Sequence, residues 1–181
     1  MLDHLWTWCF RHLGGTPAFR IWGKGRREAA WRQIDVFASA RHNLESRWPL
    51  WAGSCVTWTA HVIVVGEDFA ERLLREQRQS PASRQQPVAV AGGRLSDRQR
   101  RLQAGISGPP TASEIMAHEC GHTAQARRLG AAYLPVVGAV TLFREGPHWW
   151  NHFENEASES GLFGGLVSGS VRADWARYLR D

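Results

Sequence analysis

The sequence is poor in lysine, in cysteine and in long hydrophobic runs. Of its 22 lysines and arginines, Lys24 is the one lysine, and the arginines are spread along the chain without a dense block. The net charge of +5 therefore does not by itself indicate a nucleic-acid partner, and we expect none. We interpret the arginine excess as a consequence of genome base composition, with a lysine-depleted protein delivered into another cell as the alternative.

The scarcity of cysteine and of long hydrophobic runs argues against further classes of protein. Cys9, Cys55 and Cys120 are far apart and odd in number, which argues against a disulfide framework and a zinc ribbon and favours a reducing compartment. The longest nearly uncharged run, residues 131–143, is too short to span a bilayer. Charged residues also interrupt any signal-peptide core in residues 1–22. We expect a cytoplasmic protein without an integral membrane segment, in which residues 131–143 form a buried wall.

What is present fits a globular chain. At 181 residues, with 43% hydrophobic and 22% charged residues, the sequence can bury the core of one domain. We expect that domain to span residues 1–181 in four parts: an aromatic and helical segment (1–50), a strand–helix–loop region (51–110), a core (111–161) and a C-terminal helix (162–181).

Local patterns predict the elements of the first two parts. Residues 26–47 have an apolar stripe at helical spacing, and residues 67–79 read as a charged helix with one apolar face. Residues 56–65 are rich in β-branched side chains and predict a strand. The proline- and glycine-containing stretch 80–110 predicts a loop with a short helix at 96–104.

The strongest signal is an H-E-x-x-H pattern formed by His118, Glu119 and His122. On a helix, histidines four residues apart lie one turn apart on the same face, where they can bind one zinc ion together. Glu119 points to nearly the same side and can accept a proton from water. Cys120 lies round the helix from His118 and is expected in the core, whereas Gly121 allows a neighbouring backbone to approach closely.

Clear end signals place this pattern on a helix over residues 112–129. Thr111 and Glu114 match a capping box, and Gly130 suits the helix end. A helix in this position favours a metal site over the alternative interpretation, an ordinary solvated helix face.

A catalytic zinc site needs a third protein ligand. The chain continues from the pattern as H-E-x-G-H-T-x-Q and L-G-x-x-Y-L-P through residue 135, and then carries E-x-x-A from Glu154 to Ala157. Over roughly residues 111–161 it resembles small bacterial zinc metallopeptidase-like proteins of the gluzincin type. That resemblance implies an α+β, mainly helical, zincin-like minimal metalloprotease domain with a small β-sheet upstream of the active-site helix. It also implies Glu154 as the third zinc ligand.

Other donors near Glu154 are alternatives for the third ligand: Glu156, Glu159, His148 and His152. The chain also departs from the gluzincin pattern after the alanine, where relatives often carry an aspartate or asparagine that orients a ligand histidine. Ser158 stands there, and Asn155 or Glu159 are candidates to compensate.

The resemblance implies hydrolysis of a protein or peptide substrate, with Glu119 as general base. For the donor that stabilises the oxyanion, Tyr178 is the first candidate, followed by Tyr133, His148 and His152. An extended substrate is expected to lie along the edge of residues 56–65 or 88–91. We interpret His61 as structural.

Two other classes of function stay open. The first is a zinc-binding interaction or regulatory protein without turnover, which the serine at position 158 favours. The second is a nucleic-acid binder that uses the arginines and tryptophans.

Overall fold

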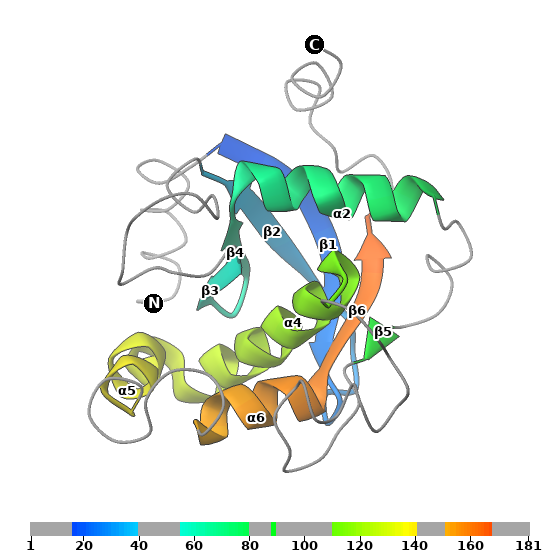
Figure 1. Ribbon diagram of the computed structural model, residues 1–181. Coiled ribbons are helices and arrows are strands. Elements are labelled where there is room, and N and C mark those ends of the chain that lie inside the picture. Colours follow the sequence, from blue (N-terminus) through cyan, green and yellow to red (C-terminus); the bar gives the residue numbers. More distant parts are fainter. Residues whose placement is uncertain (1–15, 40–54, 80–87, 90–109, 141–150, 168–181) are drawn as a thin grey trace.

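The computed structural model describes residues 16–39, 55–79, 88–89, 110–140 and 151–167. Within them the chain forms one six-stranded sheet of order β3-β4-β2-β1-β6-β5, and α2 and α4 cross one face of it (Figure 1). The strands are β1 Thr16–Gly25, β2 Arg32–Ala38, β3 Cys55–Thr59, β4 Val62–Val65, β5 Val88–Ala89 and β6 Gly161–Leu166. The helices are α2 Glu67–Gln79, α4 Ala112–Leu129, the 3-10 turn η3 Gly130–Ala132, α5 Tyr133–Val140 and α6 His152–Ser160.

The α+β class is as expected, but the sheet is larger than predicted and is not confined to the region before α4. It is antiparallel except between β2 and β4. The strand β6 follows α6 and pairs with β1 on one side and with β5 on the other. The predicted C-terminal helix over residues 162–181 is therefore wrong at its start, and residues 168–181 lie outside the described part of the chain.

The predicted helix over residues 26–47 is also wrong in its described part. Arg32–Ala38 is a strand in which Ile34 and Val36 face the core while Gln33 is exposed. The apolar residues of this segment also fit the spacing of a helical face, and so short a run does not distinguish the helical period from the strand period. Pairing with β1 decides the outcome, because β1 and β2 form a long antiparallel hairpin.

Residues 56–65 are extended as predicted, but they form a hairpin rather than one strand. β3 and β4 pair across a turn at Ala60 and His61, and β3 is one edge of the described sheet. The side chain of His61 is exposed, its N–H donates to Thr59, and its carbonyl accepts from Asp35 N–H. These backbone contacts agree with the structural interpretation of His61.

Helix α4 has the bounds predicted for it. Thr111 and Glu114 form the capping box, and Gly130 ends the helix with a φ of 57°. The carboxylate of Glu76 in α2 also accepts from the N–H groups of Ala112 and Ser113, at 2.7 and 2.9 Å. This negative charge stabilises the first turn, where backbone donors lack partners within the helix. The predicted helix over residues 67–79 is confirmed as α2, whereas residues 96–104 lie outside the described part.

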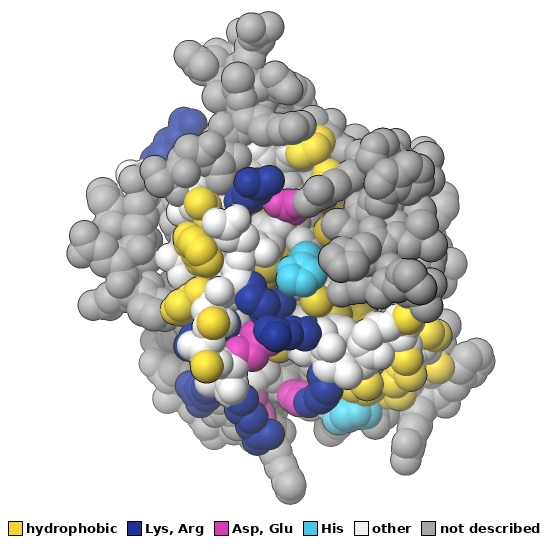
Figure 2. All heavy atoms as spheres, turned by 180° about the vertical axis from the view of Figure 1, so that it is seen from behind, with side chains coloured by type: hydrophobic (Ala, Val, Ile, Leu, Met, Phe, Trp, Pro, Cys, Tyr) yellow, Lys and Arg dark blue, Asp and Glu magenta, His cyan; other side chains and the backbone are white. Residues whose placement is uncertain are grey.

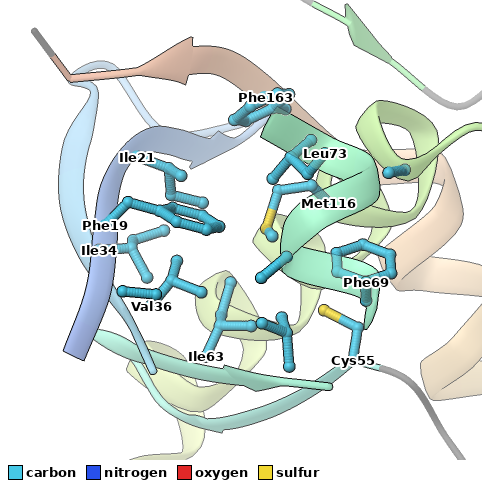
Figure 3. Close-up of a cluster of buried hydrophobic side chains, with 14 of the residues drawn as sticks. Phe19, Ile21, Ile34, Val36, Cys55, Ile63, Phe69, Leu73, Met116 and Phe163 are labelled. Carbon is cyan, nitrogen blue, oxygen red and sulfur yellow. The ribbon is translucent and has the colours of Figure 1, made fainter. Parts of the chain in front are cut away.

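The largest cluster of buried apolar side chains among the described residues lies between the sheet, α2 and α4 (Figure 3). Cys120 is fully buried in it and Cys55 is nearly so. Burial raises the pKa of both thiols, so they stay protonated. Cys120 is thus a core residue, as predicted. The larger side chains of this core include Phe19, Ile21, Ile34, Val36, Ile63, Phe69, Leu73, Met116 and Phe163.

One buried arginine ties the sheet to the middle of α4. Arg32 donates to the carbonyl of Ala60 at 2.6 Å, to the carboxylate of Glu28 at 2.8 Å and to the hydroxyl of Thr123 at 3.2 Å. The β1–β2 turn, the β3–β4 turn and α4 therefore meet at one side chain. A charge this well paired tolerates burial.

The expectation of a buried wall after α4 is wrong for residues 131–140, the part that the structure describes. Tyr133 is the buried residue of α5, whereas Val136 is 36% exposed. Helix α5 lies beside the end of α4 rather than beneath it, so one of its faces stays open (Figure 1). Figure 2 shows hydrophobic side chains gathered at its lower right, the corner that holds α5. In the described part of the chain, no helix is long and apolar enough to cross a bilayer.

Replacing Gly121 by alanine tests how closely α4 and α6 pack. A Cβ at Gly121 would overlap the backbone of Ala157, so Gly121→Ala should lower the free energy of unfolding by about 1–3 kcal/mol, as overpacking does. Gly138→Ala in α5 is the control, because a Cβ there meets nothing and should stabilise by up to about 1 kcal/mol. Urea denaturation measures both. Equal stabilisation by the two substitutions would contradict the close approach.

Candidate metal centre

Three side chains predicted to bind metal meet at one point. His118 and His122 come from α4 and Glu154 from α6, and their ligand atoms all lie within 4.8 Å of one another. The Nε2 atoms of the two histidines are 3.1 Å apart, and Glu154 Oε2 lies 3.1 Å from His118 Nε2 and 3.3 Å from His122 Nε2. This cluster has the donors and the spacing to hold a metal ion.

The packing of α6 against α4 brings Glu154 to the histidines. Asn151 begins α6 by accepting from Phe153 N–H at 2.9 Å, and it is completely buried. One helical turn beyond Glu154, the backbone of Ala157 rests on Gly121. Because Gly121 lies between the two histidines in the sequence, this close contact of the helices falls at the level of the cluster.

His118 is oriented by Ser158, the residue that departs from the gluzincin pattern. His118 Nδ1 lies 2.8 Å from the Ser158 hydroxyl oxygen, and Ser158 is buried. We expected Asn155 or Glu159 to compensate. Ser158 makes the contact itself, because it stands four residues after Glu154 and so shares its face of α6. A neutral hydroxyl therefore supports this imidazole in place of a carboxylate.

His122 is oriented by Gln125, the last residue of the H-E-x-G-H-T-x-Q pattern, to which the sequence analysis assigned no role. Gln125 Oε1 lies 2.8 Å from His122 Nδ1. Since an amide oxygen can only accept, Nδ1 carries a proton, and in the neutral imidazole the lone pair is then on Nε2, toward the cluster. The position of Gln125, three residues after His122 on the same helix, was the signal that could have identified it.

Of the alternative third ligands, the three that lie in the described residues are not part of the cluster. Glu156 pairs with both terminal nitrogens of Arg128, at 2.6 and 2.8 Å, and hydrogen bonds from Arg128 lower the pKa of its carboxyl. The ring of His152 is exposed and packs on Phe153, with ring centroids 4.0 Å apart. Glu159 is likewise absent from the metal-ligand cluster found among the described residues, and His148 lies outside them.

Glu119, the predicted general base, is held by the edge strand β3. Its side chain is 6% exposed, and the hydroxyl of Thr57 lies 2.6 Å from Oε2 and 3.0 Å from the backbone carbonyl oxygen of Glu119. A hydrogen bond of this length to a carboxylate fixes the position of the acid. Nothing in the sequence around Thr57 indicated this contact, which joins residues 62 positions apart.

Tyr133 lies beside the centre, whereas Tyr178 is outside the described residues. The Tyr133 ring is 5% exposed, and its centroid is 6.5 Å from that of His122. Burial, and then the nearby carboxylates of Glu119 and Glu154, raise the pKa of Tyr133 well above its usual range. Its phenol therefore stays protonated and keeps a donor close to the cluster.

Comparison with known proteins adds no relative. No protein-family model matches the chain, and neither a curated protein nor a solved structure is significantly similar to it. The functional argument therefore rests on the geometry of the site.

The charge of the cluster predicts that a metal ion displaces a proton when it binds. Burial lowers the pKa of His122, but the carboxylate of Glu154 outweighs burial and raises the pKa to about 9. At neutral pH the metal-free imidazole is therefore protonated, and a metal must compete with that proton. The zinc affinity should rise by about tenfold per pH unit below pH ~9 and level off above it.

Calorimetric titration with zinc, in buffers that differ in ionisation enthalpy, measures the released proton directly. The expected result is release of about one proton per zinc near neutral pH. No proton release, together with an affinity independent of pH, would contradict the pairing of His122 with Glu154.

Proposed function

We propose that the chain is a zinc-dependent metallopeptidase of the zincin-like class, which hydrolyses peptide bonds in a protein or peptide substrate. The observation that carries this proposal is the convergence of His118, His122 and Glu154, with the carboxylate of Glu119 near enough to help raise the pKa of His122. Two imidazoles and one carboxylate are a ligand set of catalytic zinc, in which the fourth position is open to water or substrate.

The residues around the cluster fit a zinc ion. His118 and His122 would bind it through Nε2, because Ser158 and Gln125 engage the Nδ1 atoms. When bound, zinc supplies a Lewis acid that polarises a carbonyl group and lowers the pKa of water. The remaining chemistry belongs to side chains of this chain.

Glu119 is the general base in this proposal. It accepts the proton of the attacking water and delivers that proton to the departing amine nitrogen, so the carboxylate is restored at the end of the reaction. The hydrogen bond from Thr57 keeps the carboxylate in one orientation during both transfers. Because Glu119 is buried, bulk water competes little with these transfers.

Tyr133 is the donor that this site offers to the oxyanion. Its protonated phenol lies next to His122, on the border of the same cluster. A donor placed there stabilises the negative charge that develops on the carbonyl oxygen in the transition state. Tyr178, the first candidate from the sequence, stays a prediction because it lies outside the described residues.

The edge strand β3 is the proposed binding surface for an extended substrate. It is an outer strand of the described sheet, and its Thr57 touches the general base. A peptide that adds to this edge through backbone hydrogen bonds would run past Glu119. The strand β5, which forms the opposite edge of the described sheet, is the alternative binding surface.

A zinc-binding interaction protein without turnover is the second candidate. The observation that favours it is the neutral Ser158 beside His118, where a carboxylate would increase the basicity of the imidazole. Both candidates need the same ligands. They differ in Glu119, which peptide hydrolysis requires as a base and zinc binding does not require.

Glu119→Gln separates the two candidates. The substitution keeps the size of the side chain and its contact with Thr57 but removes the base, so peptide cleavage should fall by at least about 100-fold while zinc stays bound. Cleavage of a mixture of synthetic peptides, followed by mass spectrometry, measures the rate. Glu159→Gln in α6 is the control and should cleave as the wild type does. Cleavage by Glu119→Gln at the wild-type rate would refute the proposed mechanism.

A further inference from the structure

We propose that Gln125 is a positioning residue of the metal centre. A relay of hydrogen bonds from Arg128 through Glu156 to Gln125 holds the proton of the His122 ring on Nδ1. This inference rests on the metal site of the proposed function but not on turnover. Gln125 acts through the far side of the His122 ring, because its contact is with Nδ1 and not with the Nε2 atom that faces the cluster.

The side chain of Gln125 is held at both ends. It is 2% exposed, its Oε1 lies 2.8 Å from His122 Nδ1, and its Nε2 donates to the Phe153 carbonyl at 2.8 Å and to Glu156 Oε2 at 3.0 Å. Reversing the amide would turn its oxygen toward a carbonyl and a carboxylate, which cannot donate. The orientation of the amide is therefore set, and with it the acceptor that faces His122.

The outer end of the relay is a salt bridge at the surface. Arg128 is 56% exposed and Glu156 36% exposed, and the guanidinium contacts both carboxylate oxygens. Glu156 Oε2 accepts from Arg128 at 2.8 Å and from Gln125 Nε2 at 3.0 Å, so one carboxylate oxygen joins the guanidinium to the amide. Arg128 and Gln125 belong to α4 and Glu156 to α6, so the relay also joins the two helices that supply the ligands.

The consequence for the metal is a defined tautomer. Because Nδ1 must donate to an amide oxygen, the neutral, metal-binding form of His122 presents the lone pair of Nε2 to the metal. Loss of the acceptor frees the imidazole to hold its proton on either nitrogen and to turn about its bond. Replacing Gln125 should therefore lower the zinc affinity more than replacing Arg128 does, because Arg128 lies farther from His122 along the relay.

Zinc affinity, measured by competition with a chromophoric chelator, tests this inference without any substrate. Gln125→Met keeps the length of the side chain but removes the amide, and it should weaken zinc binding by about 10- to 100-fold. Arg128→Gln should weaken it less. Arg127→Gln is the matched control, because Arg127 is 61% exposed and reaches Glu28 at 3.6 Å, away from the relay. It should bind zinc as the wild type does.

A spectroscopic readout separates positioning from a general loss of structure. In the zinc-loaded wild type, nitrogen NMR of His122 should show a proton on Nδ1 that exchanges slowly with solvent. Gln125→Met should lose this slow exchange.

Unchanged zinc affinity in Gln125→Met, or slow exchange of the Nδ1 proton of His122 retained in that variant, would overturn the inference. Absence of peptide cleavage by a wild type whose zinc affinity falls with Gln125→Met would count against the proposed function alone. Failure of the wild type to bind zinc would remove both.

Discussion

The close contact of α4 and α6 is the constraint on which the site depends. Gly121 has no Cβ, and the backbone of Ala157 occupies the space that a Cβ would take. Since Gly121 lies between His118 and His122, this contact brings Glu154 within 3.3 Å of both imidazoles. A larger residue at position 121 would separate the helices and leave the two histidines without their carboxylate.

Elements far apart in the sequence complete the surroundings of the cluster. The edge strand β3 supplies Thr57 to Glu119, and the start of α5 supplies Tyr133 beside His122. Ser158 and Gln125 orient the two imidazoles through neutral groups. Each contact restricts a side chain that the proposed chemistry needs in one position, so the site is organised before a metal or substrate arrives.

Sequence reasoning succeeded where the determinants are local. The capping box at Thr111, the spacing of the histidines and the bounds of α4 all depend on neighbours within a few residues. It failed for β2 and β6, because pairing with β1 decides their conformation and no local pattern records that pairing. The partners of the site residues, such as Thr57, were out of reach for the same reason.

In the proposed metal centre, His118, His122 and Glu154 together hold one zinc ion. The zinc content of the purified protein, measured by elemental analysis beside His122→Ala, Glu154→Ala and the control Glu159→Ala, tests this ligand set. About one zinc per chain is expected in the wild type and in Glu159→Ala, and loss of zinc in the other two variants. A wild type that holds no zinc after reconstitution, or zinc retained by Glu154→Ala, would contradict it.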